Sequence, residues 1–228
     1  MLEHARSSLS VPPTEAQPLP SGAETHTQGV DDVAAAGTLL EVSRLFTALL
    51  RLTRPDIGQR TERITALVSF VVRGLDIERR WEFEVAARLS QLGCLGIAPD
   101  VLQTAARGEL LNDDDLLTVA SHPLAARDLL GEMSRLEIVA EMIARQHEPV
   151  GFAGEWIEPV RDADRLAFGG QVLRVCGEFD RLVQRGLSCQ DALCRMSGLP
   201  EEFDPAIVAR LNAWTAEVAS DVVSCSAA

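Results

Sequence analysis

Residues 170–183, with the sequence GQVLRVCGEFDRLV, carry the clearest fold signal in the chain. Apolar side chains recur there at steps of three and four residues, at Val172, Val175, Cys176, Phe179, Leu182 and Val183. This spacing places them on one face of an α-helix, and Gly186 then ends the pattern. The stretch therefore predicts an amphipathic helix that packs one face against a core.

The same period appears elsewhere in the chain. Asp31 and Asp32 are suited to cap a helix that Pro55 ends, with an apolar stripe at Leu39, Val42, Phe46, Leu49 and Leu50. A second stripe consists of Ile64, Leu67, Val68 and Val71, and a third of Val85, Ala86 and Leu89, with Glu82 at its exposed end. In a fourth, residues 136–147, His147 falls on the face that should point to the core.

Helix boundaries are indicated by capping residues and breakers. A short helix should begin near Pro99, the acidic cluster Asp113, Asp114 and Asp115 suits the start of the next, and that helix should stop around His122 and Pro123. Residues 149–170 contain glycine and proline and predict a loop. Ser188 with Asp191, and Asp204 with Pro205, predict two further N-termini. No alternating strand pattern competes, so we predict an all-α helical bundle.

Composition divides the chain into three parts. Residues 1–30 are rich in Ser, Thr, Pro and Gly and predict a disordered leader, residues 31–220 one helical domain, and residues 221–228 a C-terminal tail. The apolar runs are too short to cross a bilayer, and the leader has no secretory signal pattern. We therefore expect no membrane contact and a cytoplasmic location.

The charge and the rare residues exclude some function classes. A formal net charge of −13 disfavours a nucleic acid polymer as a partner, because phosphate neutralisation needs a basic surface. Five cysteines without a C-x-x-C pair fit neither a disulfide framework nor a zinc ribbon, so we expect reduced thiols. All 21 basic residues are arginine, and there is no tyrosine.

Short motifs spread over most of the folded region resemble the HD-GYP domain. Residues 58–63 (GQRTER) are similar to the family's G-H-S-x-R, and residues 87–100 (ARLSQLGCLGIAPD) resemble its LLHDIGKIGIPD. His122 with Pro123, residues 146–148 (QHE), residues 170–180 and residues 202–208 (EFDPAIV) resemble further motifs in the family's order. The resemblance implies an HD-domain helical bundle that, in active members, hydrolyses cyclic di-GMP at a cluster of metal ions.

The metal ligands implied by the resemblance are mostly missing. The family's ligand positions are held here by Gln59, Ser90, Gln91, Gln146 and Gly177, and only the histidines His122 and His147 remain. Amide and hydroxyl oxygens bind transition metals more weakly than imidazole or carboxylate groups do. The family's lysine is Cys94, and a segment with Phe152 and Trp156 replaces the GYP motif. We therefore predict no metal cofactor and a pseudoenzyme.

Several residues keep alternative interpretations. His122 and His147 are either hydrogen-bonded remnants or a mononuclear metal site, and Cys94 and Cys176 either small apolar residues or redox groups. Arg60, Arg63 and Arg145 either pair with nearby carboxylates or bind the phosphates of a cyclic dinucleotide. Phe152 and Trp156 either form a recognition patch for a partner protein or close over the vacated pocket.

Three functions follow from the resemblance. The leading hypothesis is an inactive signalling domain in cyclic di-GMP-related regulation that docks onto another protein, such as a diguanylate cyclase with a GGDEF domain. The second is a sensor that binds a cyclic dinucleotide without cleaving it. The third is a phosphodiesterase with an altered metal site.

Overall fold

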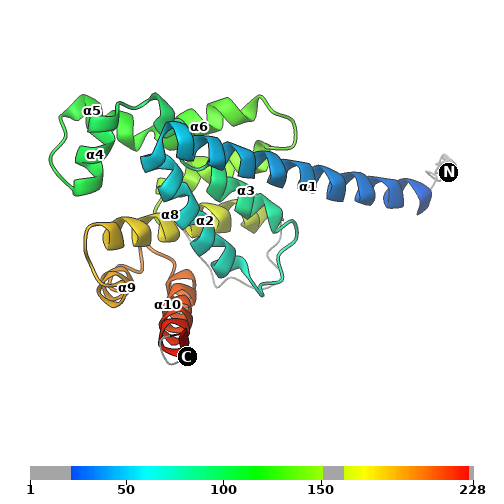
Figure 1. Cartoon of the computed structure of the whole chain (residues 1–228). Helices are drawn as coiled ribbons and strands as arrows, with labels where there is room; N and C mark the ends of the chain where they lie inside the picture. Colours follow the sequence, from blue (N-terminus) through cyan, green and yellow to red (C-terminus); the bar gives the residue numbers. More distant parts are fainter. Residues whose placement is uncertain (1–21, 151–161, 226–228) are drawn as a thin grey trace, which may run out of the picture. The chain divides into compact units, whose positions relative to one another are not determined.

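The structure, a computed structural model, describes residues 22–150 and 162–225. Within these two ranges the chain forms ten α-helices and two short 3₁₀ helices, with no strand (Figure 1). The prediction of an all-α fold is therefore confirmed. The chain divides into two units, Met1–Ala35 and Ala36–Ala228, and the apolar core lies in the second.

The bounds of the helices define the order of the elements along the chain. In chain order they are α1 (Gly22–Thr53), α2 (Pro55–Val72), α3 (Trp81–Leu89), η1 (Leu92–Gly96), α4 (Pro99–Arg107), α5 (Asp113–Ala120), α6 (His122–Gly131), α7 (Glu137–Ala144), η2 (Arg145–His147), α8 (Asp162–Gln184), α9 (Cys189–Ser197) and α10 (Pro205–Cys225). None of these helices is long and apolar enough to cross a membrane.

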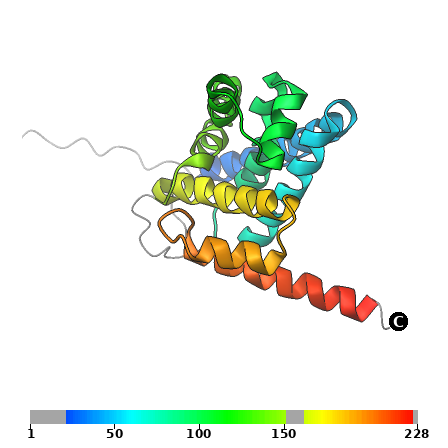
Figure 2. The same ribbon diagram turned by 90° about the vertical axis from the view of Figure 1, so that its left-hand side faces the viewer.

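Helix α8 is the centre of the core. It contacts α2, α7, α9 and α10, and Figure 2 shows it running between these elements. Its predicted stripe is confirmed, because Val172, Val175 and Cys176 have no exposed surface and Phe179 keeps only 2%. The helix that residues 170–183 predict thus organises the packing of the others.

The predicted caps of α9 and α10 are confirmed. Ser188 Oγ accepts a hydrogen bond from the Asp191 backbone N–H at 3.1 Å, at the start of α9. Asp204 accepts from the N–H groups of Ala206 and Ile207 at 2.8 and 3.1 Å, at the start of α10. Each cap satisfies N–H groups that the first turn of a helix leaves without partners.

Helix α1 differs from its prediction at both its start and its buried face. It begins at Gly22, upstream of the predicted caps Asp31 and Asp32, and residues 1–21 of the expected leader lie outside the described residues. Val42 and Leu49 are exposed, whereas Ser43 and Thr47 are buried beside Leu50. The two hydroxyls can be buried because they donate to the carbonyls of Leu40 and Ser43 in the preceding turn.

Glu82 is buried, so its predicted place at an exposed end of the α3 stripe is wrong. Only 2% of Glu82 is exposed, and its carboxylate lies 2.8 Å from Nε of Arg165, which is 3% exposed. A carboxylate can enter a core when an opposite charge accompanies it. Sequence periodicity could not reveal this partner, which lies on α8.

Two helix boundaries also differ from their predictions, and one agrees. The predicted loop 149–170 ends early, because α8 begins at Asp162. Gly169 and Gly170 lie inside α8, where an added Cβ would come within 2.6 Å of Met142 and 2.7 Å of Arg145, so they permit close packing. The predicted stop around His122 and Pro123 is confirmed, because α5 ends at Ala120. These two residues also begin α6, since proline is tolerated in the first turn of a helix. Helix α10 continues to Cys225, into the predicted tail 221–228.

Candidate functional site: a cavity at the two histidines

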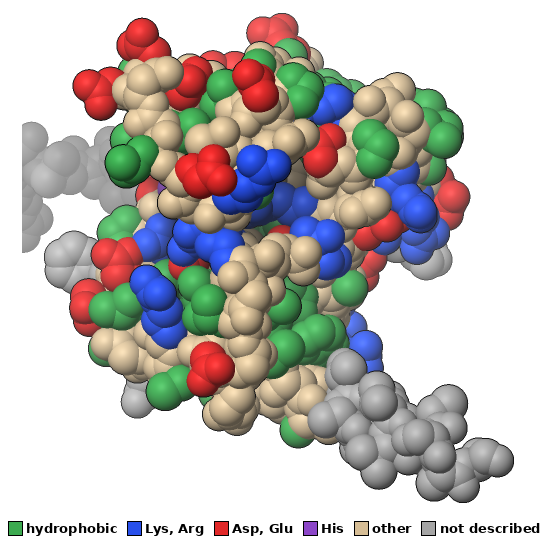
Figure 3. All heavy atoms as spheres, turned by 60° about the vertical axis from the view of Figure 1, so that its left-hand side comes forward, with side chains coloured by type: hydrophobic (Ala, Val, Ile, Leu, Met, Phe, Trp, Pro, Cys, Tyr) green, Lys and Arg blue, Asp and Glu red, His purple; other side chains and the backbone are tan. Residues whose placement is uncertain are grey.

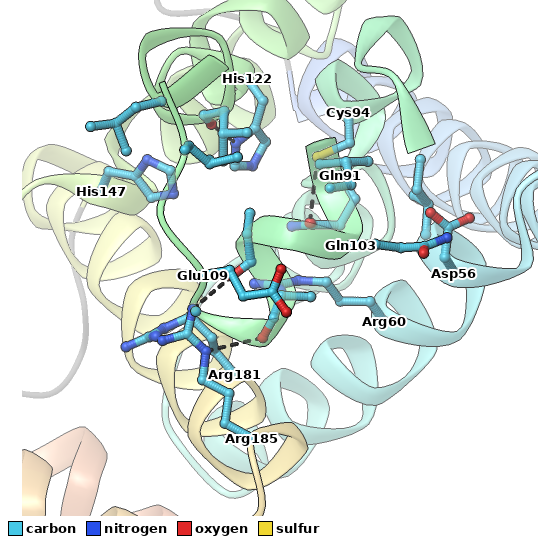
Figure 4. A pocket seen from close by; sticks show the side chains of 18 of the residues that line it. Asp56, Arg60, Gln91, Cys94, Gln103, Glu109, His122, His147, Arg181 and Arg185 are labelled. Atoms are coloured by element: carbon cyan, nitrogen blue, oxygen red, sulfur yellow. Dashed lines mark hydrogen bonds between the residues drawn. The ribbon is translucent and has the colours of Figure 1, made fainter. Parts of the chain in front are cut away.

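A cavity of about 510 Å³ opens between α2, η1 and α8 on one side and α4, α5 and the start of α6 on the other. Figure 4 shows the side chains that surround it. A second cavity, of about 330 Å³, adjoins it, and five residues line both: Arg60, Gln91, His122, His147 and Arg181. These shared residues define the inner end of the site. Two of them, Arg60 and His122, have a buried nitrogen without a hydrogen-bond partner among the described residues.

His122 lines the cavity as a neutral imidazole with one nitrogen left as an acceptor. Its Nδ1 lies 2.8 Å from the Val119 carbonyl oxygen, which can only accept, so Nδ1 carries the proton and donates. Nε2 is then an acceptor, and it is the buried nitrogen that has no partner. Burial lowers the pKa of His122 to about 4, so the ring is neutral near pH 7.

His147 repeats this arrangement from η2. Its Nδ1 lies 3.2 Å from the Ala120 carbonyl oxygen, and its pKa is lowered by desolvation and then by the charges of Arg174 and Arg60. The side chain is exposed at the edge of the cavity, so the prediction that it points to the core is wrong. Among the described residues, His122 and His147 thus offer two neutral imidazoles to one cavity.

Three of the other predicted ligand positions, Ser90, Gln91 and Gln146, form a buried polar network. Ser90, Gln91 and Gln146 are 0%, 4% and 6% exposed. Ser90 Oγ donates to the Ala87 carbonyl at 2.9 Å, Gln91 Nε2 donates to Ser90 Oγ at 3.2 Å, and Gln146 Nε2 donates to the Ser90 carbonyl at 3.2 Å. These groups therefore stabilise one another, and they supply no negative charge to the cavity.

This donor set does not fit the paired metal ions of an HD-type hydrolytic centre. Such a centre requires several imidazole and carboxylate ligands around the ions. Here two imidazoles remain, and the amides of Gln91 and Gln146 already take part in hydrogen bonds. Within residues 22–150 and 162–225, no three His, Cys, Asp or Glu side chains come together as a metal-binding group.

Three arginines, Arg60, Arg181 and Arg185, line the cavity, together with the carboxylates Asp56 and Glu109. Figure 3 shows basic side chains gathered in and around a hollow on this face. Arg60 reaches into the cavity from α2, and its buried Nε is the second nitrogen without a partner. Arg185 lies across from it, with a pKa lowered by burial and by the nearby charges of Arg181 and Arg60. An anion would relieve this mutual repulsion.

The remaining arginines at the site are held by the protein itself. Arg181 pairs with Glu178, and Arg174 pairs with Glu202 and donates to the His147 carbonyl at 2.6 Å. Arg174, Arg181 and Arg185 were missed by the sequence analysis. Their separations of seven and four residues place them on one helical face, at the C-terminal half of α8 and the residue that follows it, and this spacing was the signal that could have found them.

Of the three arginines predicted to bind a ligand, only Arg60 lines the cavity. Arg60 lines the cavity, but Arg63 does not and instead pairs with Asp180, with Nε 2.5 Å from a carboxylate oxygen. Arg145 is also absent from the lining of both cavities, because its side chain packs beside Gly170. The structure therefore supports the carboxylate-pairing interpretation for Arg63.

The structure describes two of the four remaining predicted site residues, Gln59 and Gly177. Gln59 is exposed and lines neither cavity, whereas Gly177 lines the second one. Phe152 and Trp156 lie outside the described residues, so their partner-binding role stays a prediction.

The two cysteines near the site are buried thiols. Cys94 is 5% exposed and lines the cavity, and burial raises its pKa to about 11. Cys176 has no exposed surface, and burial raises its pKa well above the ordinary value. Both are therefore protonated near neutral pH, as expected for small apolar residues rather than for redox groups.

The fold and the site together define a helical domain built around a histidine-bearing pocket. A family model described as HD domain matches residues 44–207, which is more than half of the chain. The chain therefore belongs to the HD-domain family. A comparison with curated proteins found no match.

Proposed function

We propose that this chain is a catalytically inactive, HD-GYP-like signalling domain that binds a phosphate-bearing ligand without hydrolysing it. The observation that carries the proposal is that Arg60 and His122 line one cavity and that each has a buried nitrogen, Nε and Nε2, without a hydrogen-bond partner among the described residues. Guanidinium groups are effective phosphate donors. The first ligand to test is a cyclic dinucleotide.

The polar network supports the absence of hydrolysis. Metal-assisted hydrolysis depends on ions that lower the pKa of a bound water. Ser90, Gln91 and Gln146 occupy ligand positions with neutral groups bonded to one another. The site thus favours binding over chemistry.

Calorimetry against cyclic di-GMP, other cyclic dinucleotides and inorganic phosphate tests this function. We expect binding of at least one cyclic dinucleotide, and Arg60→Gln should weaken it by roughly tenfold or more, the usual effect of losing a charged hydrogen bond. Arg127→Gln is the matched control, because Arg127 is a surface residue paired with Asp128 that lines neither cavity.

Chromatography of the same mixtures should show intact ligand. Elemental analysis should show iron, manganese and zinc well below one ion per chain. A stoichiometric pair of ions together with linearised dinucleotide would overturn the proposed inactivity.

A second candidate function is docking of a partner protein, such as a diguanylate cyclase. It is favoured by exposed leucines on α5 and α6, namely Leu116, Leu117, Leu124 and Leu129, which are 45–69% exposed. Exposed apolar side chains of this kind can mark interaction surfaces, and the acidic chain favours a partner with a basic patch. Crosslinking followed by pull-down with a purified GGDEF-domain protein tests it, and failure to recover a complex would count against it.

A further inference from the structure

The larger cavity has two chemically different ends. Its inner end is formed by residues that also line the smaller cavity, including Arg60, His122 and Arg181. Its outer end is lined mainly by apolar side chains of α4, α5 and the segment between them: Leu102, Leu110, Leu111 and Leu116, with Ile57 opposite. A ligand that filled the whole cavity would therefore meet donors at one end and aliphatic groups at the other.

The leucines at the outer end are exposed to water. Leu110 is 98% exposed and Leu116 is 56% exposed, although both line the cavity. Burial of such side chains against an apolar ligand group is favourable, because it removes apolar surface from water. These two leucines do not pack in the core, so their apolar surface is available to a ligand.

Helices α4 and α5 form a wall of the cavity rather than a part of the core. Neither helix contains a buried residue. The C-terminus of α4 is held by Arg185, which donates to the carbonyls of Ala106 and Ala105 at 3.0 and 2.6 Å, as Figure 4 shows. Gly108 ends α4 at φ +74°, and an added Cβ there would lie 2.9 Å from the guanidinium of Arg185.

The carboxylates that also line the cavity are partly neutralised. Asp56 lies 3.3 Å from Arg54, and Glu109 lies 3.8 Å from Arg107. Arg60, by contrast, has a buried Nε without a partner. Arg181 pairs with Glu178 and Arg185 donates to the carbonyls of α4, so an anionic group gains most beside Arg60, at the inner end.

We propose that this cavity binds an amphipathic anion, with a phosphate or carboxylate head at Arg60 and His122 and an apolar body against the leucines of α4 and α5. This inference rests on the proposed function and adds the ligand's chemical class. The Nδ1-protonated tautomer of His122 presents an acceptor at Nε2, so a singly protonated phosphate head can donate there while Arg60 donates to its other oxygens. Such an anion is either a free small molecule or a lipid presented by a membrane.

The test compares octyl phosphate below its micelle concentration, inorganic phosphate and 1-octanol as calorimetric ligands of the full chain. We expect octyl phosphate to bind at least about tenfold more tightly than either fragment, because only it fills both ends. Leu116→Gln should weaken octyl phosphate several-fold and leave inorganic phosphate unchanged. Leu117→Gln is the matched control, because Leu117 is the next residue of α5, is 69% exposed and does not line the cavity.

A second variant, Leu110→Ser, protects the test against loss of folding, because a side chain that is 98% exposed contributes little to stability. Competition by vesicles that contain phosphatidic acid identifies the source. If the vesicles displace octyl phosphate, the site is assigned to a lipid. If they do not displace it, the site is assigned to a soluble anion. Both results support the proposed chemistry.

The outcomes separate this inference from the proposed function. If a cyclic dinucleotide binds but octyl phosphate does not exceed inorganic phosphate, the amphipathic ligand is refuted and the proposed function stands. The same refutation follows if Leu116→Gln and Leu110→Ser both leave octyl phosphate binding unchanged. If none of the anions binds, both proposals fall.

Discussion

The rings of His122 and His147 lie edge to face, with centroids 5.0 Å apart and ring planes at 70°. Each ring directs Nδ1 to a backbone carbonyl, and each has a lowered pKa. Protonation of one ring would place a positive charge beside the other ring and near Arg60. The pair is therefore stable as two neutral imidazoles.

Stability should depend on pH through His122. Its pKa falls from 6.5 to about 4 on folding, so between these values the unfolded chain binds more protons than the folded chain. The contribution of His122 to the free energy of unfolding is on the order of 3 kcal/mol. It is complete above pH 6.5 and is lost as the pH falls toward about 4. Urea unfolding between pH 7.5 and 4.5 measures it.

A His122→Gln variant provides the control for this pH dependence. Most of the slope between pH 6.5 and 4.5 should disappear in the variant. An unchanged slope would show that other groups cause it. The lowered pKa should also be visible directly, because a proton resonance of the His122 ring should titrate well below pH 6.5.

The ion pair between Arg63 and Asp180 should stabilise the fold and leave ligand binding unaffected. Asp180 is 2% exposed, so Arg63→Leu leaves a buried carboxylate without its partner. Because the Arg63 side chain is itself 37% exposed, we expect a loss of roughly 2 kcal/mol, below the value for fully buried pairs. Chemical denaturation measures it, and Asp180→Leu in addition should restore much of the stability.

Gly93 should be irreplaceable, whereas Gly96, in the same short helix, should not. A Cβ on Gly93 would lie 1.9 Å from the His122 backbone oxygen, and no side chain can move to relieve this clash. Gly93→Ala should therefore cost about 3 kcal/mol or more in unfolding free energy. At Gly96 an added Cβ meets nothing within 4 Å, so Gly96→Ala should change stability by less than about 1 kcal/mol.

Thiol reactivity should follow burial. Cys194 is exposed, whereas Cys94 and Cys176 are buried with raised pKa values. In native protein at pH 7.5, a maleimide should label Cys194 within minutes and the two buried cysteines only after unfolding. Peptide mapping by mass spectrometry distinguishes them, and rapid native labelling of Cys94 would contradict its placement in the structure.

Local sequence features predicted the helices well where one physical signal dominated. The stripe on α8 and the caps at Ser188 and Asp204 are properties of residues close together in the chain, so they could be identified from spacing alone. Glycine was less informative. Gly169 and Gly170 indicated a loop, but they lie within α8 where another element packs closely.

The sequence by itself determined the helical class and most of the order of the elements, because short-range periodicity records these directly. The loss of most metal ligands is implied only by the resemblance to the HD-GYP domain and stays a prediction. Only the tertiary structure decided which charges meet. It paired Glu82 with Arg165 and Arg63 with Asp180, and it left Arg60 beside His122 in a cavity. The physical reason is that these partners come from different helices, and their contacts depend on how the helices pack rather than on spacing within one helix.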